Sequence, residues 1–221
     1  MDATKLVIGN KNYSSWSLRG WLAVKQAGVD FEEVFVNLGD ADFKDQLRRQ
    51  SKAAKVPVLI HGGHEVWDTL AIIEYLAETF PDADLWPEDR RERARARSIA
   101  AEMHSSFTAL RSAMPMNIRR SLPGLGRGPG VDQDIRRITE IWRGCRSAAA
   151  GGGDFLFGAW CAVDAMFAPV ASRFRTYAVD LMDEPSERYA EAVLGSAWFK
   201  EWETEALKEP WIVPEDEVEA G

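Results

Sequence analysis

Residues 5–36 read KLVIGNKNYSSWSLRGWLAVKQAGVDFEEVFV, and this stretch decides the fold. Residues 5–9 predict a β-strand, and residues 15–28 predict a helix that ends at Gly28. Residues 31–36 predict a second strand. A strand, a helix and a strand in this order form a crossover unit, so we expect the two strands to lie parallel to each other.

The following residues add a hairpin and two helices. Residues 56–60 and 64–68 predict antiparallel strands around the turn formed by His61, Gly62 and Gly63. Residues 69–80 predict an amphipathic helix, because apolar residues recur there at three- and four-residue steps. A short polar helix is predicted at residues 40–51. The predicted order is therefore βαβαββα, which gives a mixed sheet.

The second part of the chain is predicted to be entirely helical. Two prolines within residues 81–87 break the pattern and indicate a linker between domains. Helices are predicted at four stretches beyond it: 88–114, 131–150, 162–178 and 186–207. We expect the acidic tail, PEDEVEAG, to be mobile. The predicted fold is an α/β domain at residues 1–80 followed by an all-helical domain at residues 88–221.

The amino-acid composition limits the kinds of molecule that this chain is expected to bind. The chain has 221 residues, a net charge of −8 and a pI near 5.0, which argues against binding to duplex nucleic acid. The basic run RRERARAR at residues 90–97 is interpreted as a solvated helix face. The two cysteines, Cys145 and Cys161, do not form the pattern of a disulfide framework. The sequence contains no apolar run long enough to predict a signal peptide or a membrane span. We therefore expect a cytoplasmic protein without a membrane partner.

Three polar features of the first domain could meet in space. Ser14-Ser15 and Asp68-Thr69 each stand at a predicted helix N-terminus, where free N–H groups bind anions. Val56-Pro57 begins a predicted strand, and a cis bond there would turn the backbone groups of Val56 toward an extended ligand. Each feature also has a simpler interpretation, as a helix cap or as the start of an edge strand.

With these features in place, the chain resembles the glutathione transferase family over nearly its whole length. The resemblance rests on four stretches in order: NYSSWSLR (12–19), KVPVL (55–59), DTLAIIEYLAE (68–78) and FGAWCAVDAMFAPVASRF (157–174). Members with a serine at the start of the first helix, the theta and zeta classes, are the most similar. The resemblance implies a thioredoxin-like N-terminal domain that binds glutathione, a helical C-terminal domain and a homodimer.

The resemblance also assigns contacts with glutathione. It implies that the backbone of Val56 pairs with the cysteinyl part and that Lys55 faces the glycyl carboxylate. The Thr69 hydroxyl would take the γ-glutamyl carboxylate, with Asp68 near the ammonium group. In this family a serine hydroxyl stabilises the glutathione thiolate. Ser15 ranks slightly ahead of Ser14 for this role, and Tyr13 is a third candidate because other classes use a tyrosine.

The implied activity is attack by the glutathione thiolate on a small electrophile, or a glutathione-dependent isomerisation of the zeta type, with glutathione as co-substrate. Trp16, His104, Phe107 and Arg111 are expected to line the pocket for the electrophile, although ordinary core packing is an equal alternative for Phe107. The alternative function is a non-catalytic protein-interaction module with the same fold, since fold does not fix function.

Two further motifs have mainly structural interpretations. Cys161-Ala162-Val163-Asp164 matches the family's capping box, with cysteine in place of the usual hydroxyl residue. Because a thiol is a weak acceptor, this cap should be weaker by about 1 kcal/mol. His61 and His64 flank a Gly-Gly turn without an evident third ligand, so no metal site is predicted.

Overall fold

The computed structural model describes residues 3–149 and 152–219. Its single sheet contains four strands: β1 (Thr4–Ile8), β2 (Glu32–Phe35), β3 (Val58–His61) and β4 (His64–Trp67). The strand order is β2-β1-β3-β4, with β1 parallel to β2 and antiparallel to β3. β3 and β4 form the predicted antiparallel hairpin. The crossover unit and the mixed sheet predicted from the sequence are thus confirmed.

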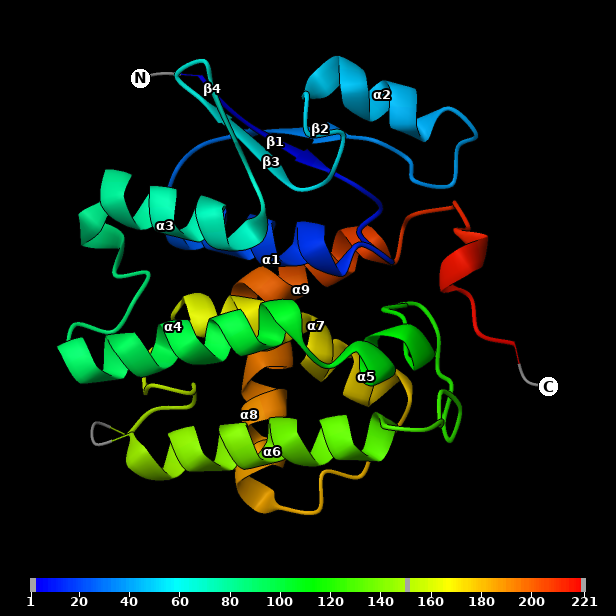
Figure 1. Ribbon diagram of the computed structural model, residues 1–221. Coiled ribbons are helices and arrows are strands. Elements are labelled where there is room, and N and C mark those ends of the chain that lie inside the picture. The colour runs from blue at the N-terminus through cyan, green and yellow to red at the C-terminus, as the bar shows by residue number, and fades with distance from the viewer. Residues whose placement is uncertain (1–2, 150–151, 220–221) are drawn as a thin grey trace.

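Helices cover both faces of the sheet (Figure 1). α1 (Ser15–Gln26) and α3 (Thr69–Thr79) lie side by side between the sheet and the remaining helices. α2 (Phe43–Gln50) covers the opposite face, where Leu47 packs into a small apolar cluster with Val7, Val36 and Val58. This arrangement is the predicted thioredoxin-like domain.

The second half of the described chain is helical, as predicted, and comprises α4 (Arg90–Ser105), α5 (Thr108–Ala113), α6 (Val131–Ala148), α7 (Ala162–Thr176), α8 (Glu184–Gly195) and α9 (Ala197–Ala206). Between α3 and α4 the chain forms only a short 3₁₀ helix, Pro81–Ala83. We propose that the boundary between the two domains lies in this segment.

Two helices predicted as continuous are each interrupted. The predicted helix 88–114 breaks at Phe107, which adopts a left-handed conformation with φ of 60° and buries its ring. The new helix start is stabilised by Asp134 of α6, whose carboxylate accepts a hydrogen bond from Leu110 N at 3.0 Å. The predicted helix 186–207 breaks at Ser196, whose hydroxyl accepts a hydrogen bond from Phe199 N at 3.3 Å and caps α9.

One continuous apolar core joins the two halves of the molecule. It contains Leu18 and Leu22 of α1 together with Met166 and Val170 of α7. The fully buried Arg19 of α1 also crosses this junction, because its Nε donates a hydrogen bond to Met166 O at 2.8 Å. α1 is therefore fixed from both sides, and its N-terminus has a defined position relative to the helical domain.

The C-terminal tail is not mobile over its described part, contrary to the prediction. Residues Pro214–Asp216 form a 3₁₀ helix, and Val213 before it is buried. The Glu217 carboxylate accepts hydrogen bonds from the Tyr13 hydroxyl at 2.6 Å and from Asn117 Nδ2 at 2.9 Å, and it pairs with Arg120 at 3.0 Å. The acidic composition suggested solvation, but these partners, which lie far away in sequence, hold the segment against the protein.

No helix within residues 3–149 and 152–219 is both long enough and apolar enough to span a membrane. In the same described ranges, no group of three or more His, Cys, Asp or Glu side chains is arranged to hold a metal ion.

Candidate active-site cleft

The start of α1 gives its two serines different environments. Ser14 is the N-cap, and its hydroxyl accepts a hydrogen bond from Ser17 N at 3.3 Å and lies 2.8 Å from Ser17 Oγ. Ser15 is the first helical residue, and its hydroxyl has no hydrogen-bond partner among the residues that the structure describes. Both serines are largely buried, so Ser15 presents the hydroxyl that is available to a ligand.

A cleft of about 440 Å³ lies beside these serines, between the thioredoxin-like domain and the helical domain. Its walls come from the loop before α1 and the start of α1, from the segment before β3, from α5 and the loop after it, and from α7 and the C-terminal segment. The lining residues are Tyr13, Ser14, Ser15, Trp16, Leu38, Val56, Thr108, Arg111, Ser112, Pro115, Met116, Arg173 and Asp216.

Val56 brings backbone groups to this cleft. The Val56-Pro57 bond is cis. Neither the N–H nor the C=O of Val56 has a hydrogen-bond partner within the described part of the chain, so both can pair with an extended ligand. Lys55 is exposed beside it and does not line the cleft.

Asp68 and Thr69 form the N-terminus of α3, outside the lining of the cleft. Asp68 has a φ of 73°, and its Oδ1 accepts a hydrogen bond from Leu70 N at 2.9 Å. Its Oδ2 lies 2.7 Å from Nε2 of His104 on α4. The Thr69 hydroxyl is buried and lacks a partner among the described residues, which is costly for a polar atom.

Trp16 connects this helix terminus with the cleft. Its ring centroid lies 5.1 Å from that of His104, which in turn contacts Asp68. His104, predicted to line the electrophile pocket, is therefore placed next to the predicted γ-glutamyl site instead. Phe107 follows the alternative given for it, ordinary core packing, because its ring is buried in the core and does not line the cleft.

Three arginines gather at the inner end of the cleft. The guanidinium groups of Arg19 and Arg111 lie 4.6 and 4.8 Å from the Trp16 ring centroid. Arg173 of α7 is almost fully buried, and its Nε donates a hydrogen bond to Met114 O at 2.7 Å. Of these three residues, Arg111 and Arg173 line the cleft.

The arginines raise the positive potential of the cleft, and each makes the protonated form of its neighbours less favourable. Burial, followed by repulsion from Arg111, lowers the pKa of Arg173 to about 10. Burial also lowers the pKa of Arg111, and for Arg19 the pKa is lowered by burial and by both neighbouring arginines. Nη2 of Arg111 and of Arg173 has no partner in the described ranges, so both can still donate to an anion.

Tyr13 is occupied by other contacts. Its hydroxyl donates to Glu217 Oε1 at 2.6 Å and accepts from Arg119 Nη2 at 2.9 Å. Burial and the hydrogen bond to Glu217 raise its pKa, so the phenol stays protonated and directed at the tail. This geometry disfavours Tyr13 as the donor to a thiol.

Sequence analysis did not identify Arg173 or Asp216 as site residues, because each reaches the cleft only through tertiary packing. Arg173 lies within the quoted stretch 157–174, but only its buried position on α7 distinguishes it from other arginines. Asp216 belongs to the tail that was predicted to be mobile.

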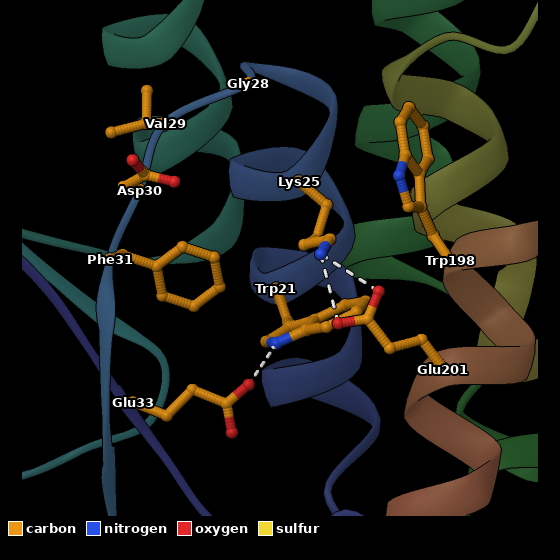
Figure 2. A pocket seen from close by; sticks show the side chains of 9 residues that line it. All are labelled: Trp21, Lys25, Gly28, Val29, Asp30, Phe31, Glu33, Trp198 and Glu201. Atoms are coloured by element: carbon orange, nitrogen blue, oxygen red, sulfur yellow. Dashed lines mark hydrogen bonds and ion pairs between the residues drawn. The ribbon is translucent and has the colours of Figure 1, made fainter.

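A second hollow, of about 420 Å³, lies between α1, the segment after it and α9 (Figure 2). The ammonium of Lys25 pairs there with Glu201 at 2.9 Å, and Trp21 Nε1 donates to Glu33 at 2.6 Å. These polar groups already partner one another. None of the residues predicted for the functional site lines this hollow, so the cleft beside the serines is the candidate site.

Comparisons with known proteins show which families the chain is similar to. Residues 5–78 match the family model described as glutathione S-transferase, N-terminal domain. A probable maleylacetoacetate isomerase of Caenorhabditis elegans is 42% identical over 96 residues, which cover 43% of this chain and 44% of that protein. The chain spans about half the length of the curated relatives it matches.

Solved structures are similar over a much larger share of the chain. A bacterial maleylpyruvate isomerase, a glutathione S-transferase of the zeta class, has a TM-score of 0.70 at 22% identity and covers 93% of this chain and 99% of its own. A glutathione transferase homologue from Burkholderia, with bound glutathione, has a TM-score of 0.69 at 22% identity over 93% of this chain and 98% of its own. At these identities the similarity establishes the fold.

Proposed function

We propose that this chain is a glutathione-dependent enzyme acting on a small anionic electrophile, because residues 5–78 match the glutathione S-transferase N-terminal domain and the fold is similar to that of solved glutathione transferases. The observation that carries the proposal is the cleft itself, which brings an unpartnered serine hydroxyl and two arginines to one cavity. Zeta-type isomerisation is the preferred reaction, since relatives that match 43% and 51% of this chain are named as a probable maleylacetoacetate isomerase and a maleylacetoacetate isomerase.

Glutathione would lie across the N-termini of α1 and α3. The unpaired N–H and C=O of Val56 support pairing with its cysteinyl part. The unpartnered hydroxyl of Thr69 supports a contact with the γ-glutamyl carboxylate, and Asp68 supports one with the ammonium group. Lys55 is exposed and free to approach the glycyl carboxylate.

The thiol of glutathione would meet the start of α1. A free thiol has a pKa of about 8.5, and lowering it by about two units requires roughly 2.7 kcal/mol of preferential stabilisation of the thiolate. The N–H groups of Ser15 and Trp16 have no partner within the described residues, and this end of the helix carries the positive end of its dipole. Together with the Ser15 hydroxyl, they are suited to hold a thiolate.

The electrophile would lie between Trp16 and the arginines. Arg111 and Arg173 each offer an unpartnered Nη2, and a guanidinium donates to carboxylates in a fixed planar geometry. A substrate that carries a carboxylate would be oriented by Arg173, and charge that develops on addition of the thiolate would be stabilised by the same cations. This polarity disfavours a plain hydrophobic electrophile.

Two measurements test the proposal against its alternative, a non-catalytic interaction module. Calorimetry should show glutathione binding that weakens when Val56 is replaced by proline, because this change removes the N–H. Turnover of an unsaturated dicarboxylate should depend on glutathione and exceed turnover of a neutral chloronitrobenzene. Absence of glutathione binding by a folded protein would favour the interaction module.

We also propose a cytoplasmic homodimer. The indole of Trp67 on edge strand β4 is 53% exposed and supports an apolar contact between two copies. Sedimentation of the wild-type chain and of Trp67→Glu should show a dimer and a monomer, respectively.

A further inference from the structure

The cleft contains a carboxylate that the proposed reaction does not use. Asp216 is the one acidic side chain among the described residues lining the cavity, and the cations lining it are Arg111 and Arg173. Asp216 reaches this position from the C-terminal segment, on the 3₁₀ helix Pro214–Asp216. Its neighbour Glu215 is exposed and does not line the cleft.

Contacts on both sides hold Asp216 in place. Before it, Val213 is buried, and its carbonyl oxygen accepts a hydrogen bond from Asp216 N at 3.0 Å. After it, Glu217 is bound by Tyr13, Asn117 and Arg120 at 2.6–3.0 Å. The backbone of Asp216 is therefore held in place at the wall of the cleft.

The charged and titratable groups around Asp216 come from several elements. α7 contributes Arg173, which attracts the carboxylate, and Tyr177. Arg111 comes from α5, and Tyr13 comes from the loop before α1. The C-terminal segment contributes Glu215 and Glu217, whose negative charges repel the Asp216 carboxylate. Arg173 is thus the cation that Asp216 neutralises at long range.

We propose that Asp216 is a specificity-determining residue that sets the charge selectivity of the cleft. It partly neutralises Arg173, so an anionic electrophile must overcome repulsion from Asp216 to reach this arginine. The cleft then binds dianions less tightly than Arg111 and Arg173 alone would bind them, while these two cations still attract a dicarboxylate more strongly than a neutral molecule. This inference rests on the proposed function, because it assumes that the electrophile occupies this end of the cleft.

The same arrangement makes the selectivity depend on pH. Burial raises the pKa of Asp216 to about 6, against the opposing effect of Arg173. Above this pH the carboxylate is charged and repels a dianion. Below it, Asp216 is neutral, and the arginines attract a dianion without competition.

The test compares Asp216→Asn with the matched control Glu215→Gln, which removes the same charge from the adjacent, solvent-facing residue. The probe is fumarate, whose carboxyl groups are already ionised in this pH range, and calorimetry measures its binding without turnover. At pH above 7, Asp216→Asn should bind fumarate about tenfold more tightly than wild type, the size expected for removal of one like charge several ångströms away. Glu215→Gln should change the affinity by less than about twofold.

The pH profile gives a second readout. Wild-type affinity for fumarate should rise as pH falls through about 6, whereas the profile of Asp216→Asn should lack this rise. Subtracting the two profiles removes contributions from groups that both proteins share.

The inference is overturned if Asp216→Asn binds fumarate with the affinity of the wild type. It is also overturned if Asp216→Asn and Glu215→Gln gain affinity equally, because the gain would then come from the net charge of the tail and not from the position of Asp216. Thermal melting confirms that each variant is folded, and Asp216→Ser serves if the asparagine variant is not. A wild-type enzyme without glutathione-dependent turnover would instead defeat the proposed function, while the fumarate measurement would still report on the charge of the cleft.

Discussion

At the scale of single residues, the two neighbouring hydroxyls at the start of α1 differ in availability. Ser14 caps the helix through Ser17, whereas the Ser15 hydroxyl lacks a partner among the described residues and lines the cleft. The family resemblance ranked Ser15 only slightly ahead, because a theta-like pattern with Arg19 favours Ser15 while a zeta-like pattern favours Ser14. Only the side-chain contacts in the structure distinguish the two hydroxyls.

Ser15→Ala should therefore raise the pKa of glutathione's bound thiol and lower turnover by about tenfold to a thousandfold. Affinity for glutathione should change little, because the lost interaction favours the ionised and transition states. Ser14→Ala should instead lower the free energy of unfolding by about 1 kcal/mol. Thiolate absorbance as a function of pH and thermal melting measure the two effects. An exchange of the two phenotypes would assign the thiol contact to Ser14.

Thr69 supports a prediction in which stability and binding change in opposite directions. Its buried hydroxyl has no partner within the described chain, so Thr69→Val should raise the stability of the free protein by about 1 kcal/mol. The same change should weaken glutathione binding by about 1–3 kcal/mol, because it removes the proposed partner of the γ-glutamyl carboxylate. Thr69→Ser is the control and should retain binding. Unchanged affinity in Thr69→Val would exclude Thr69 from the glutathione site.

At the scale of elements, the start of α7 shows how a cap survives an unusual residue. The Asp164 carboxylate accepts hydrogen bonds from Cys161 N at 2.8 Å and Leu156 N at 3.2 Å, and Cys161 completes the predicted capping box with its sulfur. Cys161→Ser should raise the free energy of unfolding by about 0.5–1 kcal/mol, because a hydroxyl is the stronger acceptor. Asp164→Ala should lower it by about 3 kcal/mol, since two N–H groups lose their partner. Denaturant melts measure both, and a destabilised Cys161→Ser would show that packing of the sulfur outweighs the cap.

Element boundaries could be predicted unevenly, for physical reasons. Gly195-Ser196 combines a helix-ending residue with a good N-cap, so the break between α8 and α9 could have been predicted from local chemistry. The break at Phe107 has no such signal, because it depends on burial of the ring and on capping by Asp134 of α6. Local propensity therefore located the helices but missed an interruption set by packing.

At the scale of the whole molecule, the continuous core implies that the two halves unfold together. Leu18 of α1 belongs to the same cluster as Val170 of α7. Leu18→Ala should cost about 2–5 kcal/mol. Hydrogen exchange should then show equal losses of protection in β1 and in α7, as expected for one cooperative unit. A loss confined to the sheet would show that the thioredoxin-like domain opens independently.

The overall architecture could be predicted, because it follows from hydrophobic periodicity and the order of the elements. The cleft residues contributed by the second part of the chain and by the C-terminal segment could not be predicted. Ser14, Ser15 and Val56 lie in local motifs, whereas Arg173 and Asp216 acquire their positions from contacts far away in the chain. A lone arginine or an acidic tail carries no local mark of such contacts.

The loop that leads to the serines is held by residues from the other end of the chain. The Glu209 carboxylate accepts hydrogen bonds from Lys11 N at 2.6 Å and Asn12 N at 3.0 Å. On the ribosome, Glu209 is made after the whole sheet and after helices α4 to α9, so a nascent thioredoxin-like domain lacks this support of the loop until the helical domain has been synthesised. A translation product that stops before Glu209 therefore has a loop whose Lys11 and Asn12 N–H groups have lost this partner.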